Sequence, residues 1–390
     1  MAVLTYRYRL YPTTAQETKL RGWLESLRLL YNFALAERRD AYKAEQRSVS
    51  AYEQNRALPD LKKRFSRYAE IHSQVLQDAI FRLDRAFKRF FSGGGYPRFK
   101  VEGRYRSFTY PQATAFRILP GGKKIRLSGI GNVPIRYHRP HEGTPKTASI
   151  VHYPSGKWWL CITCEVPDVP IQDAPLTGFD LGLENYLTSS DGAVTKPVRS
   201  LKSAQKKLGR EQRRLSRKRT GSNNRRKQRT KVARAHERVV NRRSDFLHKT
   251  SRCLVDSHDG LAFEKLSVRN MLKNHRLAKS ISDASWSVFV SMTAYKAEKA
   301  GKPFVLVPPH DTSSRCSGCD ALVPKTLKVR THECLECGVV LDRDQNAAIN
   351  IERRAGVARS YACGEAATTG EESHPHVDSS KQEALPFTAG

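Results

Sequence analysis

Two Cys-x2-Cys pairs near the C-terminal end, Cys316/Cys319 and Cys334/Cys337, place the tightest constraint on how this chain of 390 residues can fold. Each pair can offer two thiolates at the spacing of a tetrahedral site, and the fourteen residues between the pairs form a loop that can close around one ion. We therefore predict a structural Zn²⁺, which contributes folding free energy on the order of 10–16 kcal/mol in small zinc-finger peptides. Four thiolates leave no open position for water, which argues against a catalytic zinc. Two disulfides are the alternative, but no other feature of the chain suggests an oxidising compartment.

The charge of the chain is the second constraint. A formal net charge of +31 and a pI near 10.0 exceed what solubility requires, and a polyanion that releases counterions on binding is the usual partner of such a surface. Nucleic acid is therefore the expected partner. An anionic membrane is the alternative, but we find no terminal amphipathic basic helix, no signal peptide and no apolar run of about 18–20 residues. We expect a soluble, multidomain protein of the cytoplasm without a membrane partner.

Residues 201–250 form the electrostatic centre, with nineteen Lys or Arg residues against three acidic ones. Leucines recur there at seven-residue spacing and an apolar stripe follows GSNN, so we predict two antiparallel basic helices with a turn near 221–224. A merely solvated charged face is the alternative, but such an excess of one sign repels itself unless phosphates neutralise it. The predicted nucleic-acid contacts are Arg213, Arg214, Arg217, Lys218, Arg219, Arg225, Arg226, Lys227, Arg242 and Arg243.

The period of the hydrophobic pattern changes along the first 170 residues. TYRYRLYP at 5–12 alternates like a short strand, and a capping box from Thr14 to Glu17 opens a helical segment over 14–92. A period of two then predicts short strands and a small β-barrel. These candidate strands are 105–110, 114–119, 124–127, 132–138, 147–153 and 157–166. Cys161 and Cys164 fall in the last strand and are interpreted as packing residues.

Three acidic residues stand at the ends of predicted core elements. Asp180 ends a strand that forms a hairpin with 185–189, Glu264 ends the apolar run 260–264, and Asp344 precedes a helix. Such elements can bring three carboxylates together, and hard oxygen ligands of this kind suit two Mg²⁺ ions that hydrolyse a phosphodiester. Each residue also has a simpler interpretation: Asp180 closes a turn, Glu264 pairs with a neighbouring cation, and Asp344 caps its helix. Together, in so basic a chain, they favour a functional site because buried carboxylates are costly without a metal or partner.

The segment 359–390 is rich in small and polar residues and is predicted to be disordered. It contains His374 and His376, a pair that is similar to the paired histidines of single-strand nucleases with a covalent tyrosine. The proline between them and the absence of strand pattern argue against that function.

The acidic and cysteine motifs together resemble those of the TnpB (OrfB) proteins of bacterial insertion sequences, relatives of the type V CRISPR nucleases. The motifs are Gly178-Phe-Asp180-Leu-Gly182, Phe263-Glu264-Lys265-Leu266, the four-cysteine knuckle and Asp342-Arg-Asp344-Gln-Asn346-Ala-Ala-Ile-Asn350. The N-terminal TYRYRLYPTTAQETKL, the segment AFKRFFSGGGYPRFK and SISDASWSVFV extend the resemblance over nearly the whole chain except the tail.

This resemblance implies an α+β and α/β multidomain fold. It implies a wedge-like β-barrel (1–13 and 93–170), an inserted helical recognition domain (14–92), an RNase H-like RuvC nuclease domain (171–311 and 338–358) with the basic helices as an insertion, and a zinc knuckle (312–337). It also implies an Mg²⁺-dependent, RNA-guided DNA endonuclease, in which a transposon-end RNA pairs with the double-stranded target. The partner transposase of the same element is a further candidate partner.

The family's three catalytic carboxylates fall on Asp180, Glu264 and Asp344. The run DRD offers two aspartates, and the family pattern Asp-x-Asn-Ala-Ala selects Asp344, which leaves Asp342 a structural role. Two alternatives stay open: a regulator that only binds nucleic acid, and a DNA-binding transposase that joins strands without a guide. The intact set of carboxylates favours the endonuclease, because a pure binding protein has no need of acids that repel phosphate.

Overall fold

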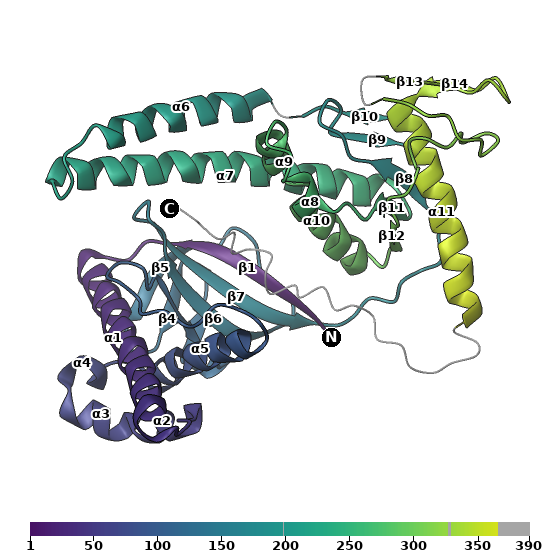
Figure 1. Ribbon diagram of the computed structural model, residues 1–390. Helices are drawn as coiled ribbons and strands as arrows, with labels where there is room; N and C mark the ends of the chain where they lie inside the picture. The colour runs from purple at the N-terminus through teal and green to yellow at the C-terminus, as the bar shows by residue number, and fades with distance from the viewer. Residues whose placement is uncertain (198, 327–328, 366–390) are drawn as a thin grey trace. The chain divides into compact units, whose positions relative to one another are not determined.

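The computed structural model describes residues 1–197, 199–326 and 329–365. The chain divides into two compact units, Met1–Pro167 and a second unit that begins at Asp168 (Figure 1). This division lies close to the predicted junction after residue 170, and the finer domain boundaries remain predictions. In the described part of the chain, no helix is long and apolar enough to cross a lipid bilayer. The predicted disorder of the tail and the pair His374 and His376 fall outside the described residues.

The first unit is built on one antiparallel sheet of seven strands in the order β2-β6-β7-β1-β5-β4-β3. Its strands are β1 (Ala2–Leu10), β2 (Ser107–Tyr110), β3 (Phe116–Ile118), β4 (Lys124–Leu127), β5 (Gly131–Arg136), β6 (Thr144–His152) and β7 (Trp158–Val166), with a 3-10 turn η1 (Ala113–Ala115) before β3. The six predicted later strands are therefore confirmed. Among the described pairings β2 and β3 do not join, so the predicted barrel is an open, near-barrel sheet.

Strand β1 lies at the centre of this sheet, between β7 and β5, although it comes first in the chain. Tyr6, Tyr8 and Leu10 alternate along it and are buried, which is the period-two pattern of a strand with one face on the core. In β7, Cys164 is buried and Cys161 is half-buried, and neither forms a disulfide, which agrees with their interpretation as packing residues.

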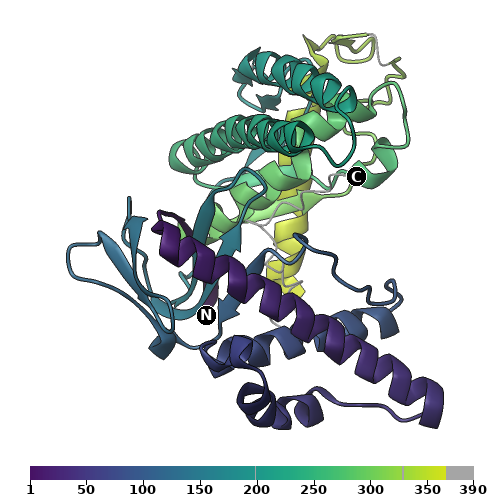
Figure 2. The ribbon, with the colours of Figure 1, turned by 90° about the vertical axis from the view of Figure 1, so that its left-hand side faces the viewer.

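Most of the chain between β1 and β2 is helical, as expected from the sequence (Figure 2). The helices are α1 (Thr14–Glu45), α2 (Ala51–Arg56), α3 (Leu58–Arg64), α4 (Ser66–Ala69) and α5 (Ser73–Phe91). One apolar face of α1 is buried, and it is formed by Leu20, Trp23, Leu24, Leu27, Leu30 and Tyr31.

The capping box of α1 is one residue earlier than predicted. The Thr13 hydroxyl accepts from the backbone N–H of Gln16 at 3.3 Å, and the Gln16 side chain accepts from the N–H of Thr13 at 3.1 Å. The predicted box from Thr14 to Glu17 was therefore wrong. Both spacings satisfy the sequence rule for a capping box, and the sequence alone does not separate them.

The second unit contains a mixed sheet of five strands in the order β10-β9-β8-β11-β12. The strands are β8 (Thr177–Asp180), β9 (Leu187–Ser189), β10 (Val194–Thr195), β11 (Leu261–Glu264) and β12 (Phe304–Val307). The first three are antiparallel, which confirms the predicted hairpin at Asp180, whereas β8, β11 and β12 run parallel. Parallel neighbours end at the same edge of a sheet, so this topology brings the ends of β8 and β11 together.

Helices cover both faces of this sheet. They are α6 (Arg199–Ser216), α7 (Asn223–Ser257), α8 (Val268–Met271), α9 (Ala278–Ala284), α10 (Trp286–Lys299) and α11 (Arg343–Glu365). Phe179 and Phe263 pack with residues of α7 and α10, whereas Ala262 packs with Ile351 of α11 on the other face. A Cβ added at Gly178 would lie 2.0 Å from the carbonyl oxygen of Ala348, so only glycine allows α11 to approach β8 this closely.

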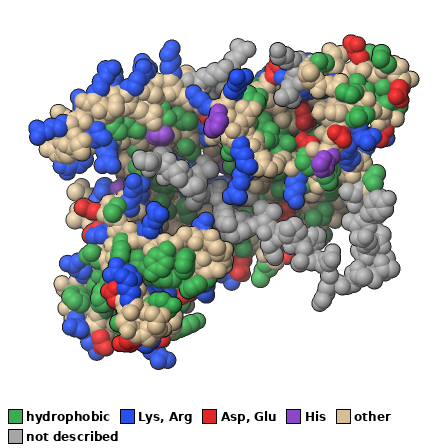
Figure 3. Space-filling view, viewed as in Figure 1, with side chains coloured by type: hydrophobic (Ala, Val, Ile, Leu, Met, Phe, Trp, Pro, Cys, Tyr) green, Lys and Arg blue, Asp and Glu red, His purple; other side chains and the backbone are tan. Residues whose placement is uncertain are grey.

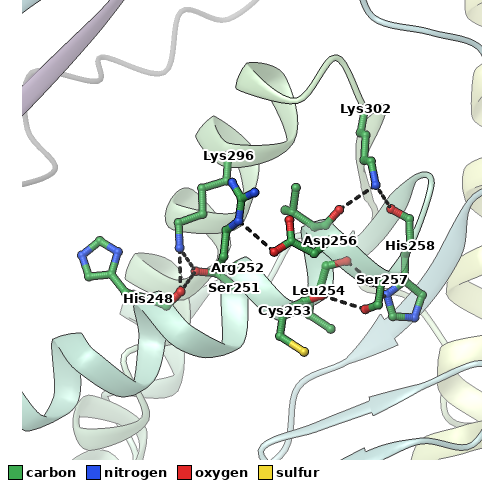
Figure 4. Close-up of polar contacts among 11 residues, drawn as sticks. His248, Ser251, Arg252, Cys253, Leu254, Asp256, Ser257, His258, Lys296 and Lys302 are labelled. Carbon is green, nitrogen blue, oxygen red and sulfur yellow. Dashed lines mark hydrogen bonds and ion pairs between the residues drawn. The ribbon is translucent and has the colours of Figure 1, made fainter. Parts of the chain in front are cut away.

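Helices α6 and α7 run side by side as the predicted basic hairpin, and the second helix begins at Asn223 after Ser222, which caps it (Figure 1). The C-terminal half of α7 is tied to the unit by two lysines (Figure 4). Lys296 Nζ donates to the carbonyl of His248 at 2.7 Å, and burial lowers the pKa of Lys296 to about 8. Lys302 Nζ donates to the carbonyls of Val255 and His258 at the end of the helix. These bonds hold the base of the hairpin against α10 and the start of β12.

Candidate functional site

Asp180 and Glu264 end the neighbouring parallel strands β8 and β11, and Asp344 lies in the first turn of α11. The three carboxylates interact: burial first, then the charges of Asp344 and Glu264, raise the pKa of Asp180 to about 7. Burial also raises the pKa of Glu264. A buried carboxyl group such as that of Asp180 holds its proton near neutral pH unless a cation neutralises it, and a strongly shifted pKa of this kind marks a candidate functional site.

The carboxylates of Asp180, Glu264 and Asp344 are less tightly grouped than the sulfur atoms of the four cysteines. Among the described residues, the four cysteines form the one group of three or more potential ligands whose atoms all lie within 4.8 Å of one another. The carboxylate oxygens are therefore near enough to repel one another but do not converge on a single point.

The structure separates the roles of the two aspartates in DRD. Asp342 is exposed, and its Oδ1 accepts from the backbone N–H of Asp344 at 2.9 Å and of Gln345 at 3.3 Å. It is therefore Asp342 that caps α11, and the alternative in which Asp344 caps its own helix is wrong. Asp344 is 4% exposed and pairs with Arg343 at 3.2 Å and Arg330 at 3.6 Å.

A hydroxyl that was not predicted from the sequence orients Glu264. Thr312 is buried, and its Oγ1 donates to Glu264 Oε1 at 2.9 Å. Thr312 is held in turn by α11, because Asn350 Nδ2 donates to the carbonyl of Thr312 at 2.8 Å. The loop that precedes the cysteines is thus part of the carboxylate cluster.

Two buried asparagines on α11 clamp that loop. Asn346 and Asn350 both donate to the carbonyl of Arg315 at 2.8 Å, and Asn346 Oδ1 accepts from the N–H of Ser317 at 2.9 Å. Their spacing of four residues on an otherwise apolar helix face was a signal in the sequence, since buried amides require such partners.

The four predicted zinc ligands converge as expected. Their sulfur atoms all lie within 4.8 Å, with Cys316 and Cys337 at 3.5 Å and Cys319 and Cys334 at 3.5 Å. The thiols are free, so the disulfide alternative is wrong. A tetrahedral ion with Zn–S bonds of about 2.3 Å separates its sulfurs by about 3.8 Å, which these positions fit. Strands β13 (Thr331–Glu333) and β14 (Val340–Asp342) flank the second pair.

The basic hairpin carries a groove between its helices of about 280 Å³. Lys and Arg side chains gather along the outer edge of α6 and at the tip of the hairpin in Figure 3. The groove is lined by Ala204, Lys207, Glu211, Arg214, Lys231, Arg234, Ala235 and Arg238. Of the ten predicted contacts, Arg214 is among these. The other four cations of the groove were not predicted, because charge alone does not show which way a side chain faces.

Two of the ten predicted contacts are half-buried against partners within the protein. The Arg225 guanidinium donates to the carbonyls of Leu215 and Lys218, which closes the turn between the helices. Arg243 pairs with Asp283 at 2.8 Å. Both are half-buried, whereas the other eight predicted residues are exposed. The ten contacts with nucleic acid remain predictions.

The fold defines the structural class. It is similar to the solved structure of Cas12f1 in a complex with single-guide RNA and target DNA, with a TM-score of 0.56 over 90% of this chain and 98% of that chain at 14% identity. Residues 286–351 match the TNB domain of Cas12f1-like proteins. The chain has the Cas12f1-like fold.

The sequence relatives define the family. Residues 160–275 match the model of OrfB of IS605 elements, "Probable transposase", and residues 1–47 match its "Helix-turn-helix domain". In this structure the latter residues form β1 and one continuous helix, α1. A "Putative RNA-guided DNA endonuclease" of Streptomyces pristinaespiralis is 38% identical over 99% of this chain and 97% of its own length. InsQ of Escherichia coli, described in the same words, is 32% identical over 94% of this chain and 95% of its own. The chain belongs to the TnpB (OrfB) family.

Proposed function

We propose that this protein is a transposon-encoded, RNA-guided DNA endonuclease and that Asp180, Glu264 and Asp344 are its catalytic residues. The observation that carries the proposal is the proximity of these three carboxylates at one sheet edge, where burial and then the charges of Asp344 and Glu264 raise the pKa of Asp180. Phosphate would be repelled by this cluster without cations, so a protein that only binds nucleic acid gains nothing from it. The order β10-β9-β8-β11-β12 is consistent with the RNase H-like RuvC domain that the family resemblance implies.

Mg²⁺ is the cation whose chemistry fits the cluster. Carboxylate oxygens are its preferred protein ligands, and two such ions activate water and stabilise the leaving oxygen of a phosphodiester. Asp180 would hold the ions from the sheet edge, and Asp344 from the helix. Glu264 is oriented by the Thr312 hydroxyl, which leaves its second oxygen for a ligand.

Zn²⁺ is the metal that the cysteine cluster fits, and we propose a structural role for it. All four positions of a tetrahedral ion would be filled by thiolates. The cluster lies between Thr312 and Asp342, so the ion would fix the two chain segments that reach the carboxylates from this side.

The assignment of Asp344 is tested against its neighbour. We expect Asp344→Ala to lower the DNA cleavage rate by about 10³-fold, because a metal ligand is lost. Asp342→Ala removes an N-cap, so it should lower the free energy of unfolding by about 1 kcal/mol and leave cleavage nearly unchanged. Cleavage assays and thermal melting of both variants check this. Loss of cleavage in Asp342→Ala with normal cleavage in Asp344→Ala would reverse the assignment.

Guide RNA and target DNA are the proposed partners of the basic hairpin. We expect the double variant Lys231→Gln, Arg238→Gln to bind RNA or DNA about three- to tenfold more weakly and to make the slope of log Kd against log salt shallower by about 1–2, since each lost phosphate contact releases one counterion fewer. Lys249→Gln, an exposed lysine on the same helix outside the groove, is the control. An unchanged slope in the double variant would remove the groove from the interface.

A further inference from the structure

Four aromatic rings gather in the first unit, at the C-terminal end of α5 and on the segment that follows it. Phe87, Phe90 and Phe91 come from the last two turns of the helix. The ring of Tyr96 packs edge-to-face on them, with its centre 5.2 Å from that of Phe90 and 5.7 Å from that of Phe87. Phe91 is nevertheless 78% exposed, and Tyr96 is 45% exposed. We call these four residues the aromatic platform, and exposed apolar groups that cluster in this way mark binding surfaces.

A glycine turn fixes the platform. The N–H of Gly93 donates to the carbonyl of Phe90 at 3.0 Å, and that of Gly94 donates to the carbonyl of Arg89 at 2.8 Å. Gly93 has a φ of 87°, and a Cβ at Gly94 would lie 2.6 Å from the carbonyl oxygen of Arg89. Both positions therefore require glycine. The exposed rings belong to a defined turn and not to a frayed helix end.

The segment after the turn extends this surface along α1. Asn32 of α1 holds the backbone of Lys100 from both sides, because its Oδ1 accepts from the N–H at 2.7 Å and its Nδ2 donates to the carbonyl at 2.9 Å. Phe99 is 45% exposed, and the guanidinium of Arg39 lies over its ring, 5.3 Å from the centre. Aromatic rings and guanidinium planes are the two kinds of side chain on which unpaired bases stack.

Cations surround the rings. Residues 85–100 contain five Lys or Arg residues and no acidic residue. Arg85 and Lys88 pair with aspartates of α5, whereas Arg89 and Arg98 are exposed and form no ion pair with any residue that the structure describes. Such a surface repels a second copy of itself, and the same charges attract phosphate. Charge complementarity therefore selects a nucleic acid as the partner of this surface.

Exposed rings among cations are the two components of a site for unpaired nucleotides: bases stack on the rings, and the phosphates between them contact the cations. We propose that the aromatic platform binds unpaired nucleotides of the guide RNA, with one base on Phe91 and phosphates at Arg89 and Arg98. Folded RNA presents such bases in its loops and bulges, whereas the target DNA arrives as a duplex whose bases already stack on one another. This inference rests on the proposed function and adds an RNA contact in the first unit that is independent of the basic hairpin.

The test measures the affinity of the full protein for its guide RNA. Phe91→Ala should weaken RNA binding about five- to tenfold, since a stacking contact is lost, and should leave the slope of log Kd against log salt unchanged, since no charge is removed. Arg89→Gln should make that slope shallower by about 1. Phe91→Tyr keeps the ring and should bind like the wild type. Tyr52→Ala removes an exposed ring from α2 of the same unit and is the control, with a Kd within about twofold of the wild type.

Chemical probing of the RNA bases locates the contact. A short unpaired stretch should be protected by the wild type and by Phe91→Tyr, and should be reactive in the complex with saturating Phe91→Ala. Unchanged RNA affinity and protection in Phe91→Ala would overturn the proposal. With RNA binding unchanged, weaker DNA binding by the assembled complex would assign the surface to a DNA strand, and a wild-type dimer that Phe91→Ala dissociates would assign it to a second copy. A wild type that binds no RNA would instead contradict the RNA-guided function itself.

Discussion

Replacing Asp180 by asparagine is expected to abolish DNA cleavage and, at the same time, to stabilise the protein in the absence of Mg²⁺. Cleavage should fall by about 10³-fold or more, because a neutral amide is a weak ligand for the proposed ions. The stability gain has an electrostatic origin: burial and the charges of Asp344 and Glu264 raise the pKa of Asp180 to about 7, so its ionised form is unfavourable in the folded state. Loss of that charge should raise Tm by about 2–5 °C at pH 8.

The pH dependence of this gain follows from the direction of the pKa shift. The folded protein keeps the Asp180 proton up to about pH 7, whereas the unfolded chain loses it near the ordinary value of 3.8. The free energy of unfolding of the wild type therefore falls as pH rises through this window. The advantage of Asp180→Asn should be absent below the window, grow across it and level off above pH 7.

Thermal melting at several pH values in Mg²⁺-free buffer measures this effect. A chelator is left out because it would also remove a metal from the cysteines. Asp259→Asn, an exposed aspartate just before β11, is the control and should show neither effect. A lower Tm for Asp180→Asn at pH 8 would indicate that Asp180 has a structural role.

Removal of one ligand of the cysteine cluster is the second change with a large expected effect. Cys316→Ser should lower the zinc content from about one ion per chain to nearly none, lower Tm, and reduce cleavage at least tenfold. Cleavage suffers because the loop over Thr312 to Ser317 joins the cluster to Glu264 through the hydroxyl of Thr312. Elemental analysis, melting and cleavage assays measure the three effects.

Two further variants make this prediction specific. Cys253→Ser alters an exposed free thiol on α7 and should change none of the three quantities. Thr312→Val keeps the shape of the side chain but removes the donor to Glu264, so zinc should stay bound while cleavage falls about tenfold. A wild type that is fully folded without metal, or a Cys316→Ser variant with normal cleavage, would contradict the proposed role of the cluster.

The elements that were predicted correctly are those in which a local sequence pattern is compatible with only one structure. Period-two alternation located β2 to β7, and the spacing of the cysteines located the cluster that the structure forms. The strand ends at Asp180 and Glu264 were also predictable, because an apolar run that stops at a carboxylate marks the edge of a core. Asp180 and Glu264 come together because β8 pairs in parallel with β11, although the long basic hairpin separates these two strands in the sequence.

Other features depend on direction and distance, which a sequence pattern does not contain. Thr13 and Thr14 both fit a capping box, and only backbone geometry places the start of α1. Asp342 and Asp344 lie two residues apart, yet one faces solvent and caps α11 while the other is buried. The hydroxyl of Thr312 reaches Glu264 only because two asparagines of α11 hold its loop, a contact between segments far apart in the chain. Arg225 and Arg243 lie in the same basic run as the exposed arginines. Their guanidinium groups are half-buried, and they bind backbone carbonyls or a carboxylate within the protein.

The most direct test of the proposed function uses the protein purified with its co-expressed RNA. Matched and mismatched double-stranded DNA are supplied with Mg²⁺, and the products of the wild type and of Asp180→Asn are mapped. We predict cuts in the matched DNA by the wild type, few in the mismatched DNA, and none by the variant, although the variant still binds RNA. Equal cutting of matched and mismatched DNA would contradict guidance by RNA, and cutting by Asp180→Asn at the wild-type rate would contradict the carboxylate site.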